Sequence, residues 1–307
     1  MLPITVCRED GRRHVRVSAR ELGDLVAGLG AGGELFLVVQ RIPDLPEVYL
    51  QVWYAPVEGY YQLEHRDGGY DRHYVAYEDT PEPVLAAMAG WARGEEGWGH
   101  GLAWERMRLR APKRVRPLKL DDHERARLER RVRELLVGGY ATRAELAEAA
   151  ERFLVSGRRR PVSSEQAWEL VDRMWLERLA EQARWEDETD PERLTGAFAA
   201  LERAGITARE NFLAGPGSPR DSGIGAVGAP DARGFVYFHS GCTDSAAAGR
   251  GLPLFYGGFD GSSGTTAAVG REVVAALTAA GLPSEWDGDP DSVITVTPLD
   301  WRKRLVG

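Results

Sequence analysis

Two runs of sequence decide the fold of the first segment: Val48-Tyr-Leu-Gln-Val-Trp-Tyr54 and, after a short turn, Gly59-Tyr-Tyr-Gln-Leu-Glu-His65. Both runs are rich in aromatic or β-branched residues, and the proline and glycine between them are typical of a connection between antiparallel strands. Residues 35–39 and 73–77 have the same character on either side. The pattern predicts an antiparallel meander.

Alternate side chains of these strands point to opposite faces of the predicted sheet. Thr80-Pro81-Glu82 is typical of a helix start, so residues 84–93 are predicted to form a helix that covers one face. The other face carries aromatic and polar side chains, and we interpret it as the surface for a protein partner. Its members are Tyr49, Gln51, Trp53, Tyr60, Gln62 and Glu64.

The rest of the first segment completes an antiparallel α+β domain over residues 1–109. Ser18-Ala-Arg-Glu21 is a capping box, which predicts a helix that ends near Gly28. Residues 102–107 predict a last strand. A basic, proline-bounded linker is predicted at residues 110–119.

The remainder of the chain has helical patterns first and mixed patterns afterwards. A helical segment is predicted at residues 120–205, packed with a C-terminal α/β domain at residues 206–307. The predicted helices are 121–136, one that starts at Thr142, 164–185, 190–204 and 265–280, and the predicted strands are 206–212, 234–239, 252–256 and 293–297. The fold class is therefore α/β in the α+β sense.

The composition excludes several classes of protein. Cys7 and Cys242 are the only cysteines, which excludes a disulfide framework and a two-cysteine metal knuckle. No run approaches the roughly 18 apolar residues of a membrane helix, and the N-terminus lacks a signal-peptide pattern, which favours a cytoplasmic protein without a membrane partner. The net charge of -8 argues against a nucleic-acid partner.

One stretch keeps a nucleic-acid interpretation open. Residues 112–160 contain 14 Lys and Arg against 8 Asp and Glu, and Gly138-Gly-Tyr-Ala-Thr142 joins two helical patterns as in a helix-turn-helix. Residues 161–205 reverse the balance, with 5 basic against 11 acidic side chains. Opposed helical faces that pair with each other explain both counts more simply.

Two loop motifs lack parts of the sites that they resemble. Gly223-Ile-Gly225-Ala-Val-Gly228 has the spacing of a dinucleotide-binding loop, but Pro230 and a strand follow where a helix is required. Asp287-Gly-Asp289-Pro-Asp291 has the acids of a calcium loop, but Ser292 stands where glycine is required. We interpret residues 213–233 as a Gly/Pro loop and expect neither a cofactor nor a bound metal.

Candidate chemical groups lie at the ends of predicted strands in the C-terminal domain. Glu210 is a candidate acid or base, and His239 and Cys242 could assist because an imidazole can activate a thiol. Arg209 and Asn211 are candidate binding residues, since polar groups at strand ends often line ligand sites. The alternative is that these residues only finish strands and that Cys242 is a buried thiol.

The second half of the chain resembles a family of uncharacterised bacterial proteins that share a domain of unknown function. The likeness covers about residues 125–304 and is carried by Thr207-Ala-Arg-Glu-Asn-Phe212, Gly234-Phe-Val-Tyr-Phe-His-Ser240, Val269-Gly-Arg-Glu-Val-Val-Ala-Ala276 and Glu285-Trp-Asp-Gly288. Members of that family often carry clustered cysteines after the Glu-Asn-Phe motif, where thiolates could hold zinc. This chain has Leu213-Ala-Gly-Pro-Gly217 there, so the resemblance implies no metal-dependent activity.

The first segment is similar to small immunity proteins of bacterial toxin systems, in which a strand meander is followed by a helix and an aromatic closing segment, here residues 91–104. The sequence favours a non-catalytic protein-binding module of immunity or regulatory type. No spacing pairs a nucleophile, a base and an orienting group, as an enzyme would often reveal. The alternative is an enzyme that acts on a small polar substrate through a cleft in the C-terminal domain.

Overall fold

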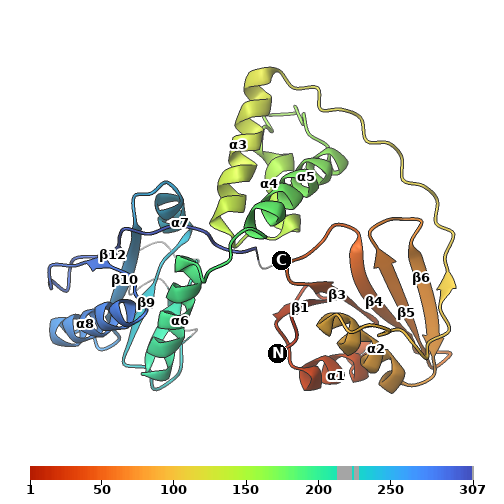
Figure 1. Cartoon of the computed structure of the whole chain (residues 1–307), viewed down its shortest axis with the longest axis horizontal. Helices are drawn as coiled ribbons and strands as arrows, with labels where there is room; N and C mark the ends of the chain where they lie inside the picture. The colour runs from red at the N-terminus through yellow and green to blue at the C-terminus, as the bar shows by residue number, and fades with distance from the viewer. Residues whose placement is uncertain (213–222, 225–227, 306–307) are drawn as a thin grey trace.

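The computed structural model describes residues 1–212, 223–224 and 228–305. Figure 1 shows a sheet unit formed by the N-terminal part, a group of helices next to it, and a second sheet unit formed by the C-terminal part. The first sheet is antiparallel throughout, and the second combines one parallel pair with antiparallel pairs. The predicted fold class, α/β in the α+β sense, is confirmed.

The N-terminal sheet has the strand order β2-β1-β3-β4-β5-β6-β7. Short connections join β3 to β6 in sequence, and each of these strands pairs with the next, as the meander predicts. The strands are β1 (Ile4–Arg8), β2 (Arg13–Val15), β3 (Phe36–Arg41), β4 (Val48–Ala55), β5 (Tyr60–Asp67), β6 (His73–Glu78) and β7 (Glu105–Arg106).

Two details of this sheet differ from the sequence prediction. The prediction lacked β1 and β2, which add two strands beside β3. The predicted strand at residues 102–107 is β7, with only two residues, because the amide of Trp104 already bonds to the carbonyl of Leu102 in a turn. A strand of that length gives almost no period-two signal.

One face of the sheet packs against α1 (Ala19–Ala27) and α2 (Pro81–Arg93), which Figure 1 shows on the same side. Leu50, Val52 and Leu63 are fully buried on this inner face, and Trp91 of α2 packs into the same core. Burying such side chains is the main stabilising contribution to a sheet of this kind. Residues that alternate with them lie on the outer face.

Three helices, α3 (Asp122–Gly138), α4 (Arg143–Phe153) and α5 (Ser164–Gln182), pack around Leu128, Leu146 and Trp175. Capping boxes at Thr142 and Ser163 start α4 and α5. Buried contacts attach this helical unit to the loop between β3 and β4. The guanidinium of Arg143 pairs with Asp44 at 2.9 Å, and the indole of Trp175 donates to the Asp44 carbonyl at 2.7 Å.

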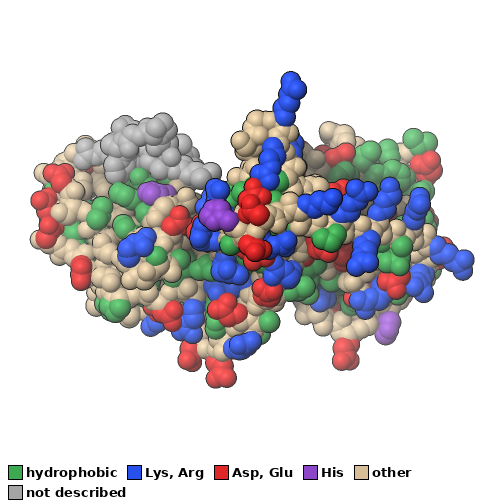
Figure 2. Space-filling model, turned by 90° about the horizontal axis from the view of Figure 1, so that it is seen from above, with side chains coloured by type: hydrophobic (Ala, Val, Ile, Leu, Met, Phe, Trp, Pro, Cys, Tyr) green, Lys and Arg blue, Asp and Glu red, His purple; other side chains and the backbone are tan. Residues whose placement is uncertain are grey.

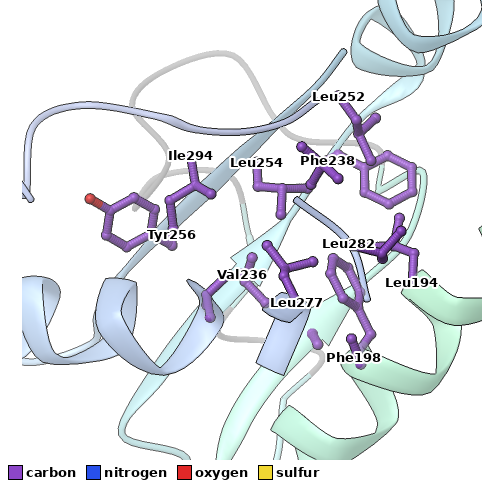
Figure 3. Close-up of a cluster of buried hydrophobic side chains, with 14 of the residues drawn as sticks. Leu194, Phe198, Val236, Phe238, Leu252, Leu254, Tyr256, Leu277, Leu282 and Ile294 are labelled. Carbon is purple, nitrogen blue, oxygen red and sulfur yellow. The ribbon is translucent and has the colours of Figure 1, made fainter. Parts of the chain in front are cut away.

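The C-terminal sheet has the order β11-β12-β10-β9-β8, and α6 and α8 cover one face. Figure 3 shows its core, in which Phe198, Val236 and Leu277 come together from α6, β9 and α8. The prediction lacked the two-residue β11. The elements are α6 (Asp190–Arg203), β8 (Ile206–Arg209), β9 (Gly234–Tyr237), α7 (Ser240–Ala247), β10 (Leu252–Gly258), α8 (Ser263–Ala279), β11 (Ser284–Glu285) and β12 (Ile294–Val296).

The C-terminal tail joins the helical unit to the second sheet unit. Trp301 packs in the sheet core and donates its indole N–H to the carbonyl of Val137 at 3.2 Å. Leu305 is buried in the helical core, and its amide donates to the side chain of Gln182 at 3.0 Å. The C-terminal tail therefore contacts both the core of the second sheet unit and the core of the helical unit.

Candidate functional site

An aromatic row crosses the outer face of the N-terminal sheet. The register aligns Phe36, Trp53, Gln62 and Tyr77 on four neighbouring strands. Tyr60 contacts the rings of Trp53 and Tyr77 edge to face, with centroids 6.4 and 5.5 Å apart, which is a favourable geometry for aromatic pairs. Tyr77 is 51% exposed, and the other aromatic rings of the row are partly exposed.

A chain of polar groups lies beside the aromatic row on the same face. Glu47 accepts from Arg66 at 2.9 Å, and Arg66 donates to Nδ1 of His73 at 2.9 Å. Because Nδ1 accepts, Nε2 of His73 carries the proton and donates to Glu64, again at 2.9 Å. The amide of Gln62 donates to the other oxygen of Glu64 at 2.5 Å. These bonds hold the polar side chains in fixed positions.

The predicted face residues therefore share one surface. Tyr49 adds its ring to the polar end, where the Arg66 guanidinium lies 5.9 Å from the ring centroid. Aromatic rings held by neighbours lose little conformational entropy on binding, which suits them to protein interfaces. The sequence interpretation did not include Tyr77 or Phe36, although the alternation along β3 and β6 places both on this face.

Glu210 is the centre of a buried polar cluster in the second sheet unit. Its Oε2 accepts from the hydroxyl of Tyr140 at 2.7 Å and from the ammonium of Lys303 at 2.8 Å. Its Oε1 accepts from the hydroxyl of Thr195 at 2.5 Å. The Lys303 ammonium also lies 4.8 Å from the centroid of the Tyr140 ring. The cluster joins α6, the end of β8, the α3–α4 turn and the C-terminal tail.

The electrostatics of this cluster favour an ionised carboxylate. Burial raises the pKa of Glu210, but the charge of Lys303 and hydrogen bonds from Lys303, Thr195 and Tyr140 outweigh it and lower the pKa overall. Burial and the Glu210 charge raise the pKa of Tyr140 far above its usual range. Both oxygens of Glu210 are thus occupied by donors from the protein, which leaves it poorly suited to exchange a proton with a substrate.

His239 and Cys242 have separate roles in the start of α7. Nδ1 of His239 accepts from the amide of Gly241 at 3.1 Å and so caps the helix, while its ring stacks on Phe255 with centroids 5.4 Å apart. Cys242 is 3% exposed, and burial raises the pKa of its thiol. A neutral buried thiol is a poor nucleophile.

The structure brings Glu210 and His239 to one edge of the sheet, because β8 and β9 are parallel neighbours. Their side chains contact different groups, the Lys303 cluster in one case and Phe255 in the other. Arg209 pairs with Glu202 of α6, and Asn211 has a positive φ of 46° at the turn that follows β8. Asparagine tolerates this left-handed conformation better than most residues, which explains its presence there.

The carboxylates of the acidic loop organise the loop itself. Asp287 and Asp289 accept amide hydrogens from Asp289 and Asp291, each at 2.9 Å, so their carboxylates organise a turn. Within the described ranges, no group of three or more His, Cys, Asp or Glu side chains could hold a metal ion. Three of the six residues of the glycine motif that starts at Gly223, and all of segment 213–217, lie outside the described residues.

Sequence reasoning missed the partners of Glu210. Tyr140, Thr195 and Lys303 lie in three separate parts of the chain, and no spacing rule links them. A lysine in a chain that otherwise uses arginine was the one available signal, since only three lysines occur.

No helix in the described part of the chain is long and apolar enough to cross a membrane.

Comparison with known proteins gives one match. The sequence profile of a family described as "Domain of unknown function (DUF6891)" matches residues 121–305, which is more than half of the chain. No curated protein and no solved structure matches. The match begins at the N-cap of α3 and ends at Leu305, so it takes in the helical unit, the second sheet unit and the tail that joins them. The chain therefore belongs to the DUF6891 family.

Proposed function

We propose that this chain is a non-catalytic protein-binding module, and that the outer face of the N-terminal sheet docks the partner. The observation that carries the proposal is the aromatic row Trp53, Tyr60 and Tyr77, which is held by ring contacts and lies opposite the helix-covered face. Rigid aromatic side chains beside satisfied polar groups are typical of the centre of a protein interface.

The state of the catalytic candidates supports the same proposal. Both carboxylate oxygens of Glu210 accept hydrogen bonds from the protein, and the imidazole of His239 accepts one from a helix amide. The Cys242 thiol is buried. An enzyme that used them would have to break these contacts before binding substrate. The domain matched by the family then acts as the body to which the binding sheet is attached through Asp44.

A pull-down from native lysate with the full chain tests the proposal. The double variant Trp53→Ala/Tyr60→Ala removes the centre of the aromatic row without touching the inner core. We expect the unmodified chain to capture one protein at a constant ratio and the double variant to capture at least about tenfold less, since central aromatic residues each contribute roughly 2 kcal/mol or more.

The matched control removes exposed apolar side chains elsewhere. Val57→Ala/Leu176→Ala changes residues that are 89% and 47% exposed, on the β4–β5 turn and on α5. Capture by this control is expected to equal that of the unmodified chain. Equal capture by the aromatic double variant would show that the outer face is not the docking surface.

A further inference from the structure

The segment that joins β7 to α3 carries an uncompensated positive charge. Residues 108–119, here called the basic segment, contain Lys and Arg but no Asp or Glu. All of its cationic side chains are exposed, and none has an ion pair or hydrogen bond with any described residue. Its cations are Arg108, Arg110, Lys113, Arg114, Arg116 and Lys119.

The basic segment is fixed at both ends. Just before it, the amide of Met107 donates to the carbonyl of His73 at 2.8 Å, which ties it to β6. Near its end, the side-chain amide of Gln166 on α5 donates to the carbonyl of Arg116 at 2.8 Å. Leu109, Val115 and Leu118 are partly buried, whereas the cationic side chains face solvent. The charges are therefore presented outward along a defined path.

The basic segment and the outer sheet face form one continuous surface. A single pocket is lined by Glu47 and Arg66 from the outer face and by Leu109, Arg110 and Pro112 from the connection. Figure 2 shows a run of Lys and Arg side chains over the N-terminal part of the molecule, beside a group of hydrophobic side chains. A partner that covered both the aromatic row and the polar end of the outer face would therefore also contact the start of the basic segment.

We propose that the partner presents an acidic segment with interspersed apolar side chains, so that its carboxylates meet the basic segment and its apolar groups meet the aromatic row. This inference rests on the proposed function. Charge complementarity argues for it, because the cations have no ion pair with the described residues of a chain whose net charge is -8.

A protein partner fits better than a nucleic acid. Glu47 and Glu64 lie on the outer face itself, where a phosphate backbone that followed the sheet would meet them. The negative net charge of the chain also opposes a long polyanion at a distance, whereas a short acidic peptide feels mainly the local cations.

The test measures fluorescence anisotropy with the full chain and a fluorescein-labelled peptide of alternating Glu and Leu. The affected variant is Arg108→Gln/Arg110→Gln/Lys113→Gln/Arg114→Gln. The control variant is Arg130→Gln/Arg133→Gln/Arg250→Gln, which removes exposed arginines that line a separate pocket between α3 and α7. We expect the four-site variant to bind the peptide at least about tenfold more weakly and the control to bind within about twofold of the unmodified chain.

The salt dependence and a second probe complete the experiment. Binding of the peptide to the unmodified chain should weaken as salt rises, and the four-site variant should show a shallower dependence. Absence of peptide binding, equal binding by the four-site variant, or tighter binding of a single-stranded oligothymidine would each overturn the inference. If the captured lysate partner is lost with Trp53→Ala/Tyr60→Ala but kept by the four-site variant, the charge inference fails while the proposed function stands.

Discussion

Glu210 shows how one buried carboxylate can join four segments of a chain. Its oxygens accept from Tyr140, Thr195 and Lys303, and each donor belongs to a different element or loop. A carboxylate and an ammonium that are 18% and 12% exposed lose much of their hydration, so the pair is stable only while its partners are complete. Removing one partner leaves the others unsatisfied.

Glu210→Gln is expected to lower the free energy of unfolding by about 2–3 kcal/mol at neutral pH, because Lys303 loses its counter-charge. The pKa of Glu210 is lowered in the folded chain, so its stabilising effect is present above the ordinary glutamate pKa and is lost as the pH falls through the folded value. Urea unfolding followed at neutral pH and at several acidic pH values measures this difference.

The control for this prediction is Glu148→Gln, which removes an exposed carboxylate that pairs with Arg152 one turn away on α4. It should cost less than about 0.5 kcal/mol. The difference in the free energy of unfolding between Glu210→Gln and the unmodified chain should become smaller in acid. A Glu210→Gln variant as stable as the control would contradict the structural role of the cluster.

Cys242 is expected to react slowly with iodoacetamide at neutral pH. Burial both hides its sulfur and raises the pKa of the thiol, so the reactive thiolate is scarce. Peptide mass spectrometry of the folded chain measures the rate, and the unfolded chain in urea gives the reference. Modification of the folded chain as fast as the unfolded one would revive a nucleophilic role.

At the scale of elements, the loop between β3 and β4 attaches the first sheet to the helical unit. Asp44 is 5% exposed, and its pKa is raised by burial although Arg143 opposes the shift. Arg143 also pairs with Asp172 of α5 at 2.9 Å. One guanidinium thus bridges two carboxylates that come from different units.

Arg143→Met is expected to lower the free energy of unfolding by roughly 2 kcal/mol or more beyond the effect of Asp44→Asn at neutral pH. The reason is that it leaves a buried carboxylate without a counter-charge. Without Arg143, the pKa of Asp44 in the folded state should rise further above its value in the unfolded state. Protonation of Asp44 in acid then stabilises the folded state of the variant. The loss from Arg143→Met should therefore shrink as the pH is lowered.

The measurement is the midpoint of thermal unfolding, followed by tryptophan fluorescence at neutral and acidic pH. Arg152→Met serves as the control, since Arg152 makes only an exposed pair on α4. Equal thermal midpoints for Arg143→Met and Arg152→Met would show that the Arg143–Asp44 pair does not stabilise the attachment of the first sheet to the helical unit. A loss that grew in acid would contradict the assigned cause.

Most of the elements that sequence reasoning predicted have a long period or a strong cap, although the short strands β7 and β12 were also predicted and the five-residue β1 was missed. Strands β3 to β6 alternate over six to eight residues, and α4 and α5 start at capping boxes, so both patterns were visible. The strands β2, β7 and β11 have two or three residues and depend on neighbours for their pairing. Local sequence carries too little of that information.

The outer face was predictable because its position follows from alternation alone, given one helix to cover the other side. The Glu210 cluster was not, since Tyr140 and Lys303 are brought to Glu210 by the tail and by the turn before α4. The position of the outer face is therefore encoded locally. The polar cluster is a product of the tertiary fold.

At the scale of the whole molecule, two sheet units serve different purposes in this account. The second sheet unit and the helices are joined by a tail that places Trp301 and Leu305 in separate cores. The first sheet is joined to them through Asp44 and the basic segment, and its outer face lies opposite α1 and α2. The body would then hold the aromatic row and the cations in one fixed arrangement.

The most direct test of this account is hydroxyl-radical footprinting of the captured complex against the free chain, read at individual aromatic side chains. Trp53, Tyr60 and Tyr77 should become protected, while Trp168 on α5 and Phe259 after β10, which are 36% and 39% exposed, should keep their oxidation rates. Protection of Trp168 or Phe259 with no change at the three residues of the aromatic row would contradict it.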